Sequence, residues 1–168
     1  EGPWAVRRVV GLDESEGVVY IMANAREPQE DPYYQHLYRV NLDGSGVQLL
    51  DPGNFDHRVQ VGESNRFFVG NYSRVNTVPS SVVIDANGRK ILDLEEADFS
   101  QLLTAGYQFP EPYSVKAADR ITDLYGVMYK PFDFDPTKQY PIIEFVYPGP
   151  QTESVSKSFS TNRYETAL

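Results

Sequence analysis

Serine catalysis is the first chemistry to consider, because the chain contains no cysteine and thiol catalysis is therefore excluded. In hydrolases whose nucleophile lies on a strand-to-helix turn, that serine stands in the pentapeptide Gly-x-Ser-x-Gly. The nearest approach is Gly-Glu-Ser-Asn-Arg at 62–66, which lacks the final glycine. The 168 residues therefore contain no nucleophile of this type.

The only two histidines, His36 and His57, each stand at the start of a predicted strand beside aromatic residues. In an α/β-hydrolase the catalytic histidine follows the nucleophile along the chain. Neither histidine fits that order, so both are interpreted as structural.

Two groups of acidic residues resemble sites only superficially. Asp133 and Asp135 are followed at once by Pro136 and lack the glycine and distal glutamate of a calcium loop. They are interpreted as a solvated turn. Glu95, Glu96 and Asp98 are assigned to the start of a predicted helix, where carboxylates favour the helix dipole. We expect no metal and no cofactor.

Composition narrows the class of protein. The net charge is −9 and the pI about 4.7, which argues against nucleic acid as a partner because phosphate binding needs a basic face. No apolar run approaches the roughly 18 residues of a membrane span. Twelve Tyr, nine Phe, 12 Gly and 12 Pro favour strands joined by turns.

Eight short runs of strand character form two sets of four before residue 95. The first set is 4–10, 18–23, 36–40 and 47–50, and the second is 57–61, 66–72, 81–84 and 90–94. The turn 41–44 (Asn-Leu-Asp-Gly) in the first set corresponds to 85–88 (Asp-Ala-Asn-Gly) in the second, 44 residues later. Four-stranded units at about 40–45 residues are the period of a β-propeller blade. We therefore predict two four-stranded antiparallel blades.

After the second set the pattern changes. Asp98 is predicted to cap a short helix that Gly106 ends, and the Phe-Pro-Glu-Pro segment at 109–112 cannot continue it. We place the domain boundary here, with 1–105 as propeller blades and 106–168 as a second domain. The strands predicted beyond the boundary are 113–118, 124–129 and 142–147.

Short sequence motifs in both halves of the chain resemble those of a known family. They are 4–6 (Trp-Ala-Val), 36–40 (His-Leu-Tyr-Arg-Val), 55–57 (Phe-Asp-His), 118–119 (Ala-Asp), 124–126 (Leu-Tyr-Gly), 130–131 (Lys-Pro), 140–143 (Tyr-Pro-Ile-Ile) and 146–150 (Val-Tyr-Pro-Gly-Pro). In this order they resemble the dipeptidyl peptidase IV branch of the prolyl oligopeptidase superfamily of serine peptidases. The chain departs from the family pattern at Arg120, where glycine is usual, at Pro148, and in the turn 62–65.

The resemblance implies a fold and one catalytic residue. The chain is expected to be mainly β: two propeller blades, a short helix, and the first antiparallel strands of an α/β-hydrolase domain. The tyrosine of the Tyr-x-Gly-Pro turn, here Tyr147, is implied to donate its hydroxyl to the oxyanion of the tetrahedral intermediate. The serine, aspartate and histidine of the triad are expected beyond Leu168, so the chain alone should be inactive.

Two functions from different classes remain open at this point. The favoured one is a fragment of a periplasmic or secreted serine exopeptidase that releases Xaa-Pro or Xaa-Ala dipeptides from peptide amino termini. The alternative is a stand-alone β-rich module that binds a protein or glycan. A reading frame that continues past Leu168 into Gly-x-Ser-x-Gly would favour the peptidase, and a stop codon there would favour the module. Self-association through exposed strand edges is also expected.

Overall fold

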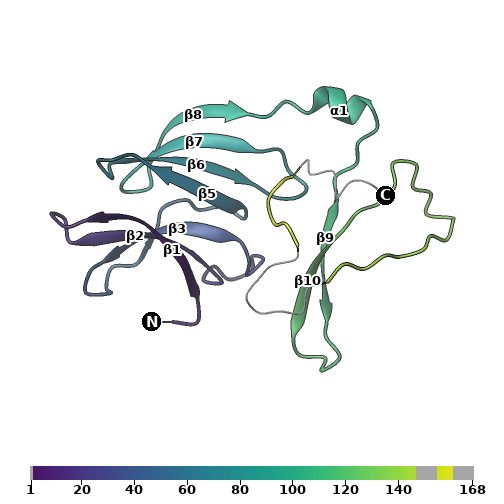
Figure 1. Cartoon of the computed structure of the whole chain (residues 1–168), viewed down its shortest axis with the longest axis horizontal. Coiled ribbons are helices and arrows are strands. Elements are labelled where there is room, and N and C mark those ends of the chain that lie inside the picture. Colours follow the sequence, from purple (N-terminus) through teal and green to yellow (C-terminus); the bar gives the residue numbers. More distant parts are fainter. Residues whose placement is uncertain (1, 147–154, 161–168) are drawn as a thin grey trace.

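A computed structural model describes residues 2–146 and 155–160. Within these residues the protein is mainly β, with two four-stranded antiparallel sheets, a hairpin and one short helix (Figure 1). The first sheet contains β1 (Ala5–Asp13), β2 (Val18–Asn24), β3 (Gln35–Asn41) and β4 (Gln48–Leu49) in that order. The second contains β5 (Asp56–Val61), β6 (Phe67–Ser73), β7 (Ser80–Asp85) and β8 (Lys90–Glu96). All eight strands predicted for this part are present.

The two sheets share one apolar core. Inward-facing side chains of β2 and β3 in the first sheet meet those of β5, β6 and β7 in the second. At the centre the rings of Tyr20 and Phe68 lie 4.8 Å apart, and both side chains are buried. Phe68 and Tyr72 of β6 and Val82 and Ile84 of β7 face this core at even spacing, the pattern of strands with one buried face.

The turns at 41–45 and 85–89 share two backbone hydrogen bonds. In each, the first residue donates its N–H to the carbonyl of the fifth and accepts from the glycine, which has φ of +85° at Gly44 and +83° at Gly88. Such angles favour glycine because it has no Cβ. The correspondence inferred from the 44-residue spacing is thus present in the backbone.

The helix α1 (Ser100–Thr104) is shorter than its sequence suggested, and Gly106 follows it at φ +94°. Assignment of Glu95 and Glu96 to the helix start was wrong, because both residues pair with β7 as the end of β8. Asp98 accepts a hydrogen bond from the Ser100 N–H, but the N-cap position is Phe99 and its side chain makes no capping bond.

The remaining strands form a hairpin of β9 (Glu111–Lys116) and β10 (Asp123–Met128). Arg120 lies in its turn with φ of +61°, a conformation that suits the glycine usual there. The strand predicted at 142–147 was wrong for 142–146, which lie in no strand and are exposed. A strand needs a backbone partner, and 142–146 have none among the described residues.

Residues 155–160 run back between the second sheet and the hairpin (Figure 1). Lys157 forms an ion pair of 2.8 Å with Asp31 in the loop before β3 and lies over the rings of Tyr33 and Tyr125. The Phe159 N–H donates to the Ser73 hydroxyl at the end of β6. This segment therefore connects both sheets with the hairpin. Among the described helices, none has the length and hydrophobicity needed to cross a membrane.

Candidate functional site

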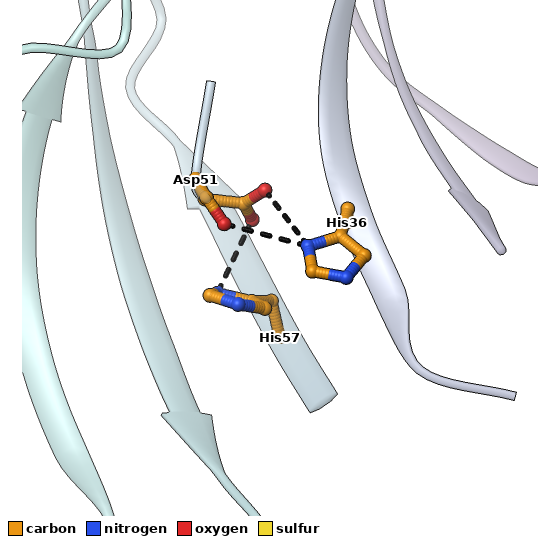
Figure 2. Close-up of side chains that lie close together, drawn as sticks. All are labelled: His36, Asp51 and His57. Carbon is orange, nitrogen blue, oxygen red and sulfur yellow. Dashed lines mark hydrogen bonds and ion pairs between the residues drawn. The ribbon is translucent and has the colours of Figure 1, made fainter. Parts of the chain in front are cut away.

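His36, Asp51 and His57 come together where the chain passes from the first sheet to the second (Figure 2). His36 lies near the start of β3 and His57 near the start of β5, while Asp51 stands in the linker that follows β4. Their side chains are only 3 %, 7 % and 5 % exposed in the order 36, 51, 57. The cluster thus joins three segments in a buried place.

The carboxylate of Asp51 lies between the two imidazole rings. Its Oδ1 is 3.6 Å from His36 Nδ1, and its Oδ2 is 3.4 Å from His57 Nδ1. Oδ1 also accepts a hydrogen bond of 2.8 Å from the Leu37 N–H, which fixes the side chain to β3. Oδ2 has no hydrogen-bond partner although it is buried.

The outer nitrogen of each ring faces a second acceptor. His36 Nε2 is 2.9 Å from the Glu30 carboxylate, and His57 Nε2 is 3.3 Å from the carbonyl oxygen of Gly53. The rings themselves lie 4.8 Å apart, and that of Tyr72 is 5.6 Å from His57. Both imidazoles are therefore held by contacts on two sides.

Burial and the surrounding charges shift the pKa values of the two histidines in opposite directions. Burial by itself lowers the pKa of His36, but the hydrogen bonds and charges of Asp51 and Glu30 outweigh this and raise the pKa to about 9. Burial also lowers the pKa of His57, and the charge of Asp51 offsets this only in part. One ring is thus charged and the other neutral near pH 7.

Chemically, the cluster offers two imidazole nitrogens and a carboxylate oxygen within 4.8 Å of one another. That set can hold a divalent metal ion, or form a buried ion pair if His36 is protonated. It includes no serine or other nucleophile, so it is not a hydrolytic triad.

The sequence interpretation of both histidines as structural is not overturned, but it missed their partners. Asp51 and Glu30 lie in a linker and a loop, where no periodicity marks a buried position. One signal was available: the chain's only two histidines both lie at the starts of predicted strands.

The other candidate residues are not brought together. Ser64 is exposed in the turn between β5 and β6, and Asp135 accepts hydrogen bonds from the Thr137 N–H and hydroxyl within its own turn. Tyr147, the predicted oxyanion donor, lies outside the described residues. Tyr140, seven residues earlier in the sequence, stacks on Phe134 and accepts a hydrogen bond from the Asp135 N–H.

Comparison with known proteins finds similarities to dipeptidyl peptidases. Residues 1–79 match the model of the dipeptidyl peptidase IV N-terminal region. A probable dipeptidyl-aminopeptidase B of Aspergillus clavatus is 30 % identical over 95 % of this chain and 18 % of its own length. Mouse dipeptidyl peptidase 8 is 30 % identical over 92 % of this chain and 18 % of its own length. The chain thus spans about a fifth of these curated relatives.

Solved structures agree on the fold. The dipeptidyl peptidase 4 of Porphyromonas gingivalis superimposes with a TM-score of 0.78 at 24 % identity, over 98 % of this chain and 23 % of that one. A putative dipeptidyl aminopeptidase IV from Bacteroides ovatus gives a TM-score of 0.72 at 26 % identity, over 95 % and 22 %. The antiparallel sheets are therefore of the kind found in dipeptidyl peptidases. Residues 1–79 are therefore similar to the dipeptidyl peptidase IV N-terminal region, and the chain as a whole is similar to dipeptidyl peptidases in sequence and fold.

Proposed function

We propose that the chain is part of a serine exopeptidase that releases dipeptides, of the Xaa-Pro or Xaa-Ala type, from peptide amino termini. The observation that carries this proposal is the continuous match of about 30 % identity to dipeptidyl peptidases over more than nine-tenths of the chain. The substrate is then a peptide with a free amino terminus.

Within that enzyme, we assign 1–105 to two consecutive blades of a β-propeller. The face-to-face sheets, their common turn geometry and the short linker between them support this assignment. We assign 106–168 to the beginning of the α/β-hydrolase domain, with the β9–β10 hairpin as its first antiparallel strands. The triad belongs to the remainder of the parent protein, because the chain has no Gly-x-Ser-x-Gly.

Tyr147 is the catalytic residue we assign to this chain. A phenol held on a rigid turn donates a hydrogen bond to the oxyanion without reorganisation, and a donor of this kind contributes about 3 kcal/mol to transition-state stabilisation. The motif of residues 146–150 supports the assignment.

The test of this role is Tyr147→Phe in the parent enzyme. We expect kcat to fall by about two to three orders of magnitude with a nearly unchanged KM, since only a transition-state interaction is lost. Tyr113→Phe is a suitable control, because Tyr113 is an exposed tyrosine of β9 in the same assigned domain. An unchanged kcat for Tyr147→Phe would show that this tyrosine has no catalytic role.

The isolated chain provides a second test. It should neither hydrolyse Gly-Pro chromogenic substrates nor react with a fluorophosphonate serine probe, because its sequence contains no Gly-x-Ser-x-Gly. Labelling of any serine in this chain would contradict the assignment of the triad to the remainder of the parent.

We further propose that the isolated chain self-associates. Every residue of β8 is exposed, including Ile91, Leu92 and Leu94, and β8 is an edge strand of the second sheet. Exposed apolar edges pair readily with other chains. Light scattering at micromolar concentration should therefore detect oligomers, and a monodisperse monomer of 19.0 kDa would contradict this proposal.

A further inference from the structure

The buried cluster of His36, Asp51 and His57 has too few protons for its contacts. Both outer ring nitrogens face groups that only accept hydrogen bonds, the Glu30 carboxylate and the Gly53 carbonyl. Both inner nitrogens face the Asp51 carboxylate, which also only accepts when ionised. His36 Nδ1 also lies 3.4 Å from the carbonyl oxygen of Asp51. All four ring nitrogens thus face only acceptors.

A neutral imidazole carries one N–H and an imidazolium two, so a charged His36 and a neutral His57 together satisfy three of these four contacts and leave one His57 nitrogen facing an acceptor without a proton. Satisfying all of them with protons would require two imidazolium cations with ring centres 4.8 Å apart in a buried place. Desolvation and mutual repulsion both oppose that state. Meanwhile Asp51 Oδ2 is buried without a hydrogen-bond partner, which is costly for a carboxylate oxygen.

We propose that His36 Nδ1, His57 Nδ1 and the Asp51 carboxylate bind a divalent transition-metal ion such as Zn²⁺, which joins the two sheets. The ion accepts the lone pairs of both inner nitrogens and gives Asp51 Oδ2 a partner. The outer N–H groups then donate to Glu30 and Gly53, so both outer contacts and Asp51 Oδ2 are satisfied.

The separations suit such an ion. Two ligand atoms at about 2.0–2.1 Å from a tetrahedral Zn²⁺ lie about 3.4 Å apart. The contacts between the Asp51 carboxylate and the two rings are 3.4 Å and 3.6 Å. The widest pair of ligand atoms, at most 4.8 Å apart, must close to about 3.4 Å when the ion binds.

The outer contacts strengthen the assignment. Histidine ligands of metals characteristically donate their other N–H to a carboxylate or a backbone carbonyl, which orients the ring and fixes its tautomer. Here His36 has the carboxylate of Glu30 and His57 has the carbonyl of Gly53. Imidazole nitrogens also select transition metals over Mg²⁺ and Ca²⁺, which prefer oxygen ligands.

The site would act on stability rather than on peptide hydrolysis. His36 comes from the first sheet, His57 from the second, and Asp51 from the linker between them. A bound ion would cross-link these three segments beside the shared core. The inference therefore does not depend on the proposed peptidase function.

Metal titration of the 168-residue chain tests the inference directly, because its only histidines are these two and it has no cysteine. We expect one Zn²⁺ per chain with a Kd at or below the micromolar range by calorimetry, and a higher Tm that EDTA reverses. Co²⁺ should give the visible absorption of a tetrahedral site. Mg²⁺ should have no effect at the same concentration.

Variants identify the ligands. His57→Gln should weaken Zn²⁺ binding by at least about 100-fold, and Glu30→Ala by about 10- to 100-fold through loss of ring orientation. Asp98→Asn, at an exposed carboxylate near α1, is the control and should bind as the original chain does. Absence of saturable binding by the original chain, or equal binding by a folded His57→Gln variant, would overturn the inference. The same original-chain titration decides the matter if His57→Gln does not fold.

Discussion

Two apolar runs of similar character end in opposite environments in this molecule. In β2, Val18–Asn24, six of the seven residues are buried. The run Ile-Ile-Glu-Phe-Val at 142–146 is exposed throughout, with Ile142 at 92 % and Phe145 at 77 %. β2 lies between β1 and β3 and is hydrogen-bonded to both, whereas 142–146 have no strand partner in the described part of the chain.

The comparison teaches that hydrophobicity selects a buried strand only where backbone partners and a facing layer exist. Among the described residues, every buried hydrophobic side chain falls between Val18 and Ile84, within the two sheets and their linkers. One face of β2 packs on the second sheet, and the other packs with Tyr38 and Val40 of β3. The two sheets thus support each other, while the hairpin and 142–146 contribute little core.

The largest effect is expected from a matched pair of phenylalanines. Phe68 is fully buried against Tyr20, so Phe68→Ala should lower the free energy of unfolding by about 3–5 kcal/mol through lost burial and a cavity. Phe145→Ala should leave it nearly unchanged, because that ring is exposed. Urea denaturation measures both. Equal destabilisation by the two variants would mean that 142–146 are packed in solution and that the contrast with β2 is wrong.

The next effect concerns the ion pair that fixes residues 155–160 to the loop before β3. Lys157 and Asp31 form an ion pair of 2.8 Å with side chains 7 % and 14 % exposed. Lys157→Met leaves the Asp31 carboxylate buried without its cation, so we expect a loss of about 3 kcal/mol in unfolding free energy.

Two controls separate charge from packing in this prediction. The double variant Lys157→Met with Asp31→Asn should recover part of the loss, because no unpaired charge remains. Lys90→Met breaks an exposed pair with Asp93 at the same distance and should have little effect. If Lys157→Met and Lys90→Met behave alike in urea denaturation, residues 155–160 do not hold the hairpin to the sheets.

Local patterns predicted most of the fold. Alternating and continuous apolar runs predicted all eight strands of the two sheets. The glycines at 44 and 88 predicted the two corresponding turns. Both features depend mainly on residues that are neighbours along the chain. The run at 142–146 was mispredicted because the same pattern requires partners that sequence periodicity does not identify. Glu95 and Glu96 were assigned to a helix although their backbones complete β8 beside Ser80 and Ser81.

The buried cluster could be predicted only in part. His36 and His57 were interpreted as structural residues, and their positions near strand starts were predicted correctly. Their relation to Asp51 depends on how the linker crosses between the sheets, and the contact of His36 with Glu30 depends on the fold of the loop before β3. Both are tertiary features, and neither Asp51 nor Glu30 stands in a motif.

A smaller effect is expected from the two corresponding turns. At Gly88 an added Cβ would lie 2.7 Å from the backbone oxygen of Leu50, whereas at Gly44 nothing lies within 4 Å. Both glycines have positive φ, so alanine costs about 1 kcal/mol at either position. Gly88→Ala should cost about 1–2 kcal/mol more than Gly44→Ala in thermal or urea denaturation, because the turn must move away from the linker. Equal costs would show that the second sheet does not approach Leu50 this closely.

The smallest effect lies in the hairpin and has the opposite sign. Arg120 has φ of +61° in the turn between β9 and β10, where the related family usually has glycine. A left-handed conformation costs a residue with a Cβ about 1 kcal/mol, and glycine avoids this cost. The greater flexibility of glycine in the unfolded chain offsets part of the resulting stabilisation. Arg120→Gly should therefore raise the unfolding free energy by less than about 1 kcal/mol. If the hairpin opens separately from the sheets, the same stabilisation should slow hydrogen exchange of the Ala117 and Thr122 amides. The Asp119 carboxylate, which accepts from the Ile121 and Thr122 N–H groups, holds the turn in both variants. Faster exchange in Arg120→Gly would mean that the arginine side chain contributes more to the hairpin than its backbone strain costs.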